Sequence, residues 1–341
     1  MYYLGIDYHK KFSQVAAMDE SGRTLMNVKL PNEQSAFLSL KSKLGDVQLK
    51  AVVEACRNWG TIYDLLESIG IETVVAHPTK TRAIAEAKIK TDSIDAATLA
   101  HLLRTDLIPK IYIPNSKIRA QKNLLRHRLW LVRQVTKTKN RIHCILDRNH
   151  IKITEVTTIF HPTGRRIMDK LSLPDIDSKL LKDHLKLLDT LEDHISRTET
   201  WIDQELDNCP EISILDSIPG FGKIFAALAT LEIADINRFL TPPKFASYCC
   251  LVPSTYSSGG NTFHGKLIPT GNKWLKYLFI DAAWSSTRSS PYCRQYFNKL
   301  KERKGWSTAI VALARRLSNI AFLCLKEKRF YEERVCAAYS F

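Results

Sequence analysis

Two acidic residues in the stretch "KTDSIDAATLA", Asp92 and Asp95, stand three positions apart. Residues three apart share one face of a helix, so the two carboxylates can act on the same ligand. Taken alone, the pair is explained as well by a solvated helix face, and Asp92 can also serve as the N-cap of a helix over roughly residues 92–104. The pair therefore indicates chemistry only if further ligands lie close to it.

Two more carboxylates end expected β-strands. Asp7 closes the strand "YLGID", and Glu54 closes the strand "AVVEA". If these strands are neighbours, both side chains project from one edge of the sheet, where Asp92 and Asp95 can join them. Four carboxylates repel one another unless a cation lies between them, and Mg²⁺ prefers carboxylate and water oxygens. The four acids therefore predict a site for one or two Mg²⁺ ions that bind a scissile phosphate.

The elements that position these acids alternate between strands and helices. Residues 2–6, "YYLGI", begin a β-meander with a turn around Ser21 and Gly22, and helices and buried strands follow. The expected order is β-β-β-α-β-α-β-α, which predicts a mixed sheet with helices packed against it over residues 1–108.

A long basic amphipathic helix is expected after this domain. Residues 115–149 carry ten Lys or Arg and a single acid, Asp147. A solvated charged face explains this run less well than contact with a nucleic-acid backbone does. His127, Trp130 and His143 could stack on bases, although Trp130 is at least as compatible with a core position.

The expected nucleic-acid contacts include two lysines before the acidic pair, the basic residues of this helix, and the later stretch "IPGFGK". In that stretch two glycines let backbone N–H groups approach a phosphate, although an ordinary turn between helices explains them equally well. The residues expected to contact nucleic acid are Lys88, Lys90, Lys117, Arg119, Lys122, Arg126, Arg128, Arg133, Lys137, Arg141, Gly220, Gly222 and Lys223.

The rest of the chain is expected to be mostly helical. Residues 175–206 carry apolar residues at sevenfold spacing, typical of a helical hairpin or coiled-coil arm, at Leu181, Leu188, Ile195 and Ile202. We expect the basic helix and arm to occupy residues 109–210. A further helical domain over residues 211–341 is expected to be broken by one loop at 253–271.

That loop contains two adjacent serines that are candidate nucleophiles. Ser257 and Ser258 precede Gly259 and Gly260, and a serine on a mobile segment can attack a substrate if a base or metal activates it. From the residues alone, a flexible polar loop is the more frequent explanation.

Composition narrows the class of protein. The chain has 341 residues, 45% of them hydrophobic, which is enough to bury more than one core. Its formal net charge of +15 favours a polyanionic partner. The eight cysteines show no metal or disulfide spacing, and no apolar run is long enough for a membrane span, so we expect a cytoplasmic protein with no membrane partner.

Taken together, the motifs resemble the DEDD transposases of bacterial insertion sequences, the family that includes the pilin-gene inverting recombinase and the bridge-RNA-guided recombinases. The matching stretches occur in the family's order and are "GIDYHKK", "VVEACRNWG", "KTDSIDAATLA", "LDSIPGFGK", "LVPSTYSSGG" and "TGNKWLKYL". The resemblance implies an RNase H-like (RuvC-like) domain, a helical coiled-coil arm and a mainly helical C-terminal transposase domain. It also implies a catalytic set of Asp7, Glu54, Asp92, Asp95 and Ser258, with Ser257 as the alternative nucleophile.

The resemblance further implies an activity and partners. DNA strands of a donor and a target would be exchanged through a 5′-phosphoserine intermediate, with Mg²⁺ at the acids. A structured non-coding guide RNA would select the sites, and a dimer or tetramer would build composite active sites. The alternatives are a metal-dependent junction-resolving nuclease that uses activated water, a DNA invertase of the same family, and a non-catalytic relic.

Overall fold

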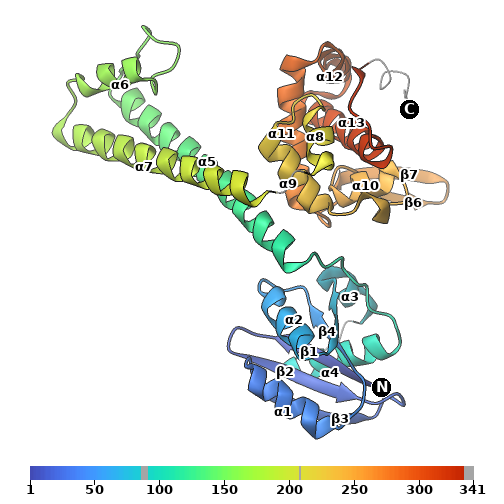
Figure 1. Cartoon of the computed structure of the whole chain (residues 1–341). Helices are drawn as coiled ribbons and strands as arrows, with labels where there is room; N and C mark the ends of the chain where they lie inside the picture. Colours follow the sequence, from blue (N-terminus) through green and yellow to red (C-terminus); the bar gives the residue numbers. More distant parts are fainter. Residues whose placement is uncertain (86–90, 207–208, 334–341) are drawn as a thin grey trace. The chain divides into compact units, whose positions relative to one another are not determined.

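The computed structural model describes residues 1–85, 91–206 and 209–333. The chain divides into two compact units, Met1–Pro114 and Asn115–Phe341, and each is described by itself (Figure 1). The further division into domains at residues 108 and 210 stays a prediction.

The first unit is built on a five-stranded mixed sheet in the order β3-β2-β1-β4-β5 (Figure 1). The antiparallel strands β1, β2 and β3 form the expected meander, and β4 and β5 run parallel to β1. The strands are β1 (Tyr2–Tyr8), β2 (Phe12–Met18), β3 (Thr24–Pro31), β4 (Leu49–Glu54) and β5 (Glu72–Ala76). The mixed sheet that the sequence predicts is confirmed.

Helices cover both faces of this sheet. On one face, α1 (Gln34–Leu44) and α2 (Trp59–Ser68) bury apolar side chains of β1, β2 and β4. On the other face, α4 (Asp92–Arg104) packs on β1 and β2 and on Val52 of β4. The short helix α3 (Pro78–Ile84) follows β5.

Helix α4 lies unusually close to the sheet because β1 carries a glycine beneath it. A Cβ atom on Gly5 would lie 1.9 Å from the carbonyl oxygen of Ala96 and 2.4 Å from the backbone nitrogen of Ala100. The strand partner of Gly5 is Ala16, so the neighbouring position on this face is also small. The backbones of β1 and α4 can therefore touch directly.

The start of α4 differs from the expectation in one residue. Thr91, in extended conformation, is the N-cap, and its hydroxyl accepts a hydrogen bond from the backbone N–H of Ile94 at 3.2 Å. The expectation that Asp92 caps this helix is wrong, because Asp92 is already the first helical residue. Its carboxylate is thus left available for other contacts.

The second unit begins with a helical hairpin. The long helices α5 (Ser116–Arg148) and α7 (Asp175–Glu205) pack side by side, with the short α6 (Pro162–Asp169) between them in sequence (Figure 1). The sevenfold apolar positions of α7 face α5, since Leu181, Leu188 and Ile202 are almost fully buried. The helical hairpin is therefore present, and the finer coiled-coil geometry stays a prediction.

The remainder of the second unit is a helical bundle around one core. Its core helix α13 (Trp306–Lys326) is long and apolar enough to cross a membrane by length and composition alone, yet most of its apolar stretch is buried among the other helices. The elements are α8 (Pro210–Asp216), α9 (Lys223–Ile233), the 3-10 helix η1 (Ile236–Arg238), α10 (Pro242–Tyr248), α11 (Lys273–Ser289), α12 (Pro291–Lys304) and α13 (Trp306–Lys326).

The bundle is interrupted by a β-hairpin where the sequence suggests a loop. Strands β6 (Pro253–Ser258) and β7 (Asn261–Leu267) pair antiparallel across two residues, Gly259 and Gly260. Both glycines have positive φ, 56° and 83°, as a tight two-residue hairpin turn requires. The expectation of an irregular loop at 253–271 is therefore wrong for most of its length.

Replacing Gly5 with Ala tests the close approach of α4. Because the added Cβ would overlap backbone atoms that cannot rotate away, we expect the free energy of unfolding of the first unit to fall by about 1–3 kcal/mol. Urea denaturation followed by circular dichroism measures this change. Gly222→Ala is the control, since a Cβ there meets nothing within 4 Å. An equal or larger loss in the control would contradict the explanation.

Candidate acid cluster and serine hairpin

The parallel pairing of β1 and β4 brings two of the acids to one edge of the sheet. Ile6 pairs with Val53, and Asp7 and Glu54 are the next residues on the two strands. Side chains alternate along a strand, so Asp7 lies on the same face as Gly5, and Glu54 lies on the same face as Val52. Both belong to the face that α4 covers.

The first turn of α4 brings a third acid to this edge. Asp92 and Asp7 are both bound by the side chain of His9, whose Nε2 lies 3.1 Å from Asp7 Oδ2 and 3.3 Å from Asp92 Oδ2. The three side chains offer ligand atoms that all lie within 4.8 Å of one another. Since ionised carboxylates only accept hydrogen bonds, Nε2 must carry a hydrogen to bind either of them.

His9 is a further member of this cluster, one that the spacing of the acids does not predict. It follows Asp7 by two residues, a spacing that places two side chains on one face of an extended chain. The turn between β1 and β2 fixes its backbone, because its N–H donates to the carbonyl of Phe12 and its own carbonyl accepts from Asn32 Nδ2. The two-residue spacing of Asp7 and His9 is visible in "GIDYHKK". It places both side chains on one face only if the chain stays extended as far as this turn.

Burial and neighbouring charge act on Asp7 in opposite directions. Burial, the largest effect, raises the pKa of the Asp7 carboxyl above its ordinary value of 3.8, and the nearby His9 lowers it. The negative charges of Asp92 and Asp95 raise the pKa of Asp7 further. Asp95 therefore lies close enough to Asp7 to repel its carboxylate. Asp7 is thus a carboxylate whose negative charge is costly unless a positive group lies beside it.

A polar chain holds the first turn of α4 against the sheet. Asn27 on β3 donates from Nδ2 to the carbonyl oxygen and the hydroxyl of Ser93, at 3.0 and 2.7 Å. Gln14 on β2 donates to the side-chain oxygen of Asn27 at 2.6 Å and is itself the strand partner of Asp7. The position of Asp92 is therefore fixed by the contacts of the next residue, Ser93.

The donor set fits a hard divalent cation. Carboxylate oxygens converge at a half-buried point, and the group at their centre is a single histidine nitrogen, which a cation can replace. Asp92 and Asp95 both repel the carboxylate of Asp7. Glu54 ends the adjacent strand β4 on the same face of the sheet as Asp7. Their assignment as ligands stays a prediction.

The two candidate serines point to opposite faces of the β6–β7 hairpin. Ser257 pairs with Thr262, and their hydroxyl oxygens lie 2.9 Å apart. Ser258 pairs with Asn261 beside the glycine turn and is exposed. Its face also carries the exposed rings of Tyr256 and Phe263, a directly opposed pair.

The basic residues of α5 differ in exposure, and several of them contact acids or aromatic rings of the second unit. Lys122 is buried and Arg126 is half-buried, and both contact Glu232. Arg128 is bound by Glu199 of α7, with its Nη2 at 2.7 Å from Oε1. The exposed members of the expected set on this helix are Lys117, Arg133, Lys137 and Arg141.

Trp130 lies outside the core. Half of its surface is exposed, and its ring stacks on His127 with centroids 5.8 Å apart. The core position considered for Trp130 is wrong, and the exposed ring leaves stacking on bases open.

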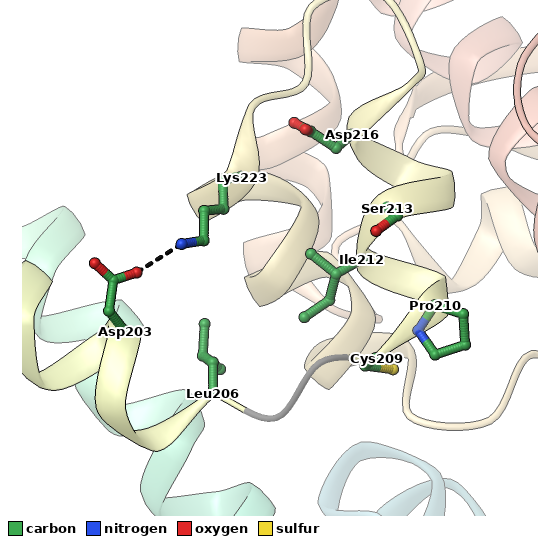
Figure 2. A pocket seen from close by; sticks show the side chains of 8 residues that line it. All are labelled: Asp203, Leu206, Cys209, Pro210, Ile212, Ser213, Asp216 and Lys223. Atoms are coloured by element: carbon green, nitrogen blue, oxygen red, sulfur yellow. Dashed lines mark hydrogen bonds and ion pairs between the residues drawn. The ribbon is translucent and has the colours of Figure 1, made fainter.

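The stretch "IPGFGK" forms a tight turn before α9. A Cβ on Gly220 would lie 2.0 Å from the carbonyl oxygen of Ala282, so close packing on α11 already accounts for this glycine. Gly222 is the exposed N-cap of α9. Lys223 binds Asp203 at 2.6 Å and lines a pocket of about 520 Å³. Figure 2 shows this ion pair and the side chains around the pocket. Contact of these residues with nucleic acid stays a prediction, and Lys88 and Lys90 lie outside the described residues.

Two family models match this chain. The IS110 DEDD model, described as "Transposase", matches residues 4–151, and the model described as "Transposase IS116/IS110/IS902 family" matches residues 212–298. A 43.6 kDa protein of insertion element IS110 from Streptomyces coelicolor is 24% identical over 98% of this chain and 96% of its own length.

Two further relatives extend the comparison. The transposase for insertion sequence element IS1111A of Coxiella burnetii is 23% identical over 96% of this chain and 90% of its own length. The pilin gene-inverting protein of Moraxella bovis is 28% identical over 42% of this chain and 48% of its own length.

A mixed sheet of RNase H-like type with acids gathered at one edge is the scaffold of a DEDD transposase. The chain belongs to the IS110 family of transposases. Its substrate is therefore DNA, which the family cleaves and rejoins, and the nuclease-like domain of such enzymes typically uses a divalent metal.

The raised pKa of Asp7 predicts a pH effect on stability in the metal-free protein. The folded chain binds this proton more tightly than the unfolded chain, so the stabilisation is complete below pH 3.8 and is lost as the pH rises through the folded-state pKa. Asn does not titrate. Relative to the unsubstituted protein, Asp7→Asn should therefore gain stability as the pH rises towards neutrality, measured by urea unfolding with a chelator present.

Asp19 provides a control of opposite sign in the same unit. Hydrogen bonds from Ser21 and Arg23 lower the pKa of Asp19, so its stabilisation is present above pH 3.8 and is lost on acidification. Asp19→Asn should lose relative stability as the pH rises. The same pH trend in both variants would contradict the assignment of the Asp7 effect to burial.

Proposed function

We propose that this transposase is a serine recombinase that joins an acid cluster to the nucleophile Ser258. The observation that carries the proposal is the convergence of Asp7 and Asp92 at a half-buried sheet edge, within a chain whose family acts on DNA. Glu54 and Asp95 complete the proposed cluster. The location of Ser258 at the tip of an exposed hairpin is compatible with delivery to a DNA strand.

The acids would hold Mg²⁺, which when bound neutralises charge on a scissile phosphate. The contribution of the chain is to fix the carboxylates before substrate arrives, through the close approach of α4 at Gly5 and the hydrogen bonds of Asn27 to Ser93. His9 contacts both Asp7 and Asp92 through its Nε2, and this nitrogen would either join the carboxylates as a ligand or give way to the cation.

The proposed chemical step conserves the phosphodiester bond energy. The Ser258 hydroxyl loses its proton as its oxygen bonds to phosphorus, the bond from phosphorus to the 3′ oxygen breaks, and the 3′ oxygen takes up a proton. The products are a 5′-phosphoserine and a free 3′-OH. Attack by the 3′-OH of the exchanged strand reverses the step, so the reaction requires no ATP.

The proposed partners are donor and target DNA, a structured non-coding guide RNA, and further copies of this chain. The exposed cations Lys117, Arg133, Lys137 and Arg141 on α5 favour contact with a phosphate backbone. A guide RNA would assign the choice of sequence to base pairing. A composite site made by acids of one protomer and the serine of another would restrict cleavage to the assembled dimer or tetramer.

A second candidate function is site-specific inversion of DNA. The similarity to a pilin gene-inverting protein favours it, although that match covers 42% of this chain. The chemistry would be the same, and only the arrangement of the exchanged sites would differ. A junction-resolving nuclease that uses activated water would need the acids without the serine.

Ser258→Ala tests the nucleophile. On a suicide DNA substrate that traps the cleaved strand, the unsubstituted protein should form a covalent protein–DNA adduct and Ser258→Ala should form none, because the attacking oxygen is missing. Gel electrophoresis under denaturing conditions detects the adduct. Ser257→Ala is the matched control and should retain it. An adduct that persists in Ser258→Ala would exclude this residue, and cleavage without any adduct would favour the nuclease.

Treatment of the purified protein with RNase tests the guide. If an RNA selects the DNA sites, its removal should abolish selective strand exchange, and adding back RNA transcribed from the DNA flanking the gene should restore it. DNA sequencing of the products measures the selectivity. Unchanged selectivity and rate after complete RNA digestion would overturn the guide-RNA proposal.

A further inference from the structure

A buried carboxylate lies at the junction of α5, α9 and α11 in the second unit. Glu232 of α9 is 3% exposed. Its Oε1 accepts a hydrogen bond from Arg126 Nε at 2.9 Å, and its Oε2 accepts one from Asn272 Nδ2 at 2.8 Å. The ammonium of Lys122 lies 3.8 Å from Oε2. A charge removed from water to this extent is maintained only where its partners hold it in place.

Asn272 closes the base of the serine hairpin. Its side-chain oxygen accepts from the backbone N–H groups of Trp274 and Leu275 and so caps α11. Its own backbone N–H donates to the carbonyl oxygen of Tyr248, the last residue of α10, at 2.7 Å. The hairpin leaves α10 and returns into α11, so this bond joins its two ends.

The residue before Asn272 also requires this close approach. Gly271 has a φ of 146°, and a Cβ on it would lie 2.5 Å from the carbonyl oxygen of Tyr248. The returning chain is thus pressed against the end of α10. One atom of Asn272, its Nδ2, remains to bind Glu232 and thereby joins the base of the hairpin to the rest of the network.

The other side of the network reaches the basic helix. Arg126 uses its guanidinium to bind Glu232 and also lies over the ring of Trp274, 5.2 Å from the centroid. Arg133, one heptad further along α5, lies 4.4 Å from the ring centroid of Tyr277. Helix α5 and the start of α11 are therefore joined by charge and by aromatic contact together.

We propose that Glu232 is a positioning residue for the serine hairpin, acting through Asn272, and that it ties the hairpin to the basic helix α5. The inference rests on the proposed function of Ser258. Oε1 accepts the first bond, from Arg126 of α5, and Oε2 accepts the second, from Asn272 at the base of the hairpin, with Lys122 of α5 3.8 Å away. Loss of the second bond detaches the base of the hairpin from Glu232, while the bond to Arg126 and the backbone bond to Tyr248 stay in place.

Asn272→Asp separates this role from helix capping. Aspartate caps a helix as well as asparagine does, so the bonds to Trp274 and Leu275 are retained. The amide that donates to Glu232 becomes a carboxylate, however, and the two negative groups repel. In Glu232→Gln with Asn272→Asp, the amide and the carboxylate are exchanged, so the bond can form again with its polarity reversed.

The experiment measures the rate of adduct formation with saturating suicide DNA, using the full-length protein after size-exclusion chromatography and well below each melting temperature. Misplacement of a nucleophile by about 1 Å can cost about a hundredfold in rate, so we expect Asn272→Asp to slow the reaction about tenfold to a hundredfold. Its affinity for DNA should be unchanged. The double variant should recover most of the rate, and the exposed Glu302→Gln of α12 should have no effect.

Hydrogen exchange of the amides at 253–267 gives a readout that does not depend on chemistry. Exchange should be faster in Asn272→Asp and return towards the original rate in the double variant. An adduct rate and hairpin exchange in Asn272→Asp equal to those of the unsubstituted protein would overturn the inference. Failure of the proposed function is distinguishable, because it shows as an adduct that is absent from the unsubstituted protein or that persists in Ser258→Ala.

Discussion

The direct contact between the backbones of β1 and α4 at Gly5 is the constraint on which the acid cluster depends. A sheet edge can gather the carboxylates of neighbouring strands, but an acid on a helix reaches that edge only if the helix lies low on the sheet. Gly5, Ala96 and Ala100 allow that approach, since no side chain separates the two backbones. The first turn of α4 also brings the positive end of the helix dipole towards the carboxylates, which offsets part of their mutual repulsion. The absence of a Cβ atom at Gly5 therefore allows Asp92 to lie beside the carboxylate of Asp7 at the sheet edge.

In the second unit, buried charges rather than close backbone packing fix the positions of the helices. Its bundle core is apolar, yet Glu232 of α9 and Lys122 of α5 are buried beside it and beside the start of α11. Burial lowers the pKa of the Lys122 ammonium, and the opposing charge of Glu232 raises it. Apolar contacts tolerate sliding of one helix along another, whereas a carboxylate bound on both oxygens admits one arrangement. The site in the first unit is held by close packing, and the hairpin in the second is held by a hydrogen-bonded ion.

Local patterns in the sequence were sufficient for the mixed sheet, the helical hairpin and the proximity of Asp7 and Asp92. Alternation, helix spacing and strand ends depend on neighbours in the chain, so they can be predicted without tertiary structure. The β6–β7 hairpin differs from the predicted loop because serines and glycines usually interrupt regular structure, although two glycines between short polar strands are a turn signal. The pairing of Lys122 and Arg126 with Glu232 could not be predicted, since Arg126 and Glu232 are 106 residues apart and meet only when α5 packs on α9. The sequence of a basic helix does not show which of its cations face solvent and which form ion pairs inside the fold.

The two-glycine turn of the hairpin makes the choice between Ser257 and Ser258 a matter of parity. In a strand, the odd and even positions face opposite ways, and the turn fixes which of them pairs with Asn261. Inserting or deleting a single residue in the turn could shift the register and exchange the two hydroxyls between the faces without changing either serine. The function of this tip therefore depends on the length of the turn as well as on the serine. A chain that kept both serines but had a turn of different length could present Ser257 where Ser258 is required.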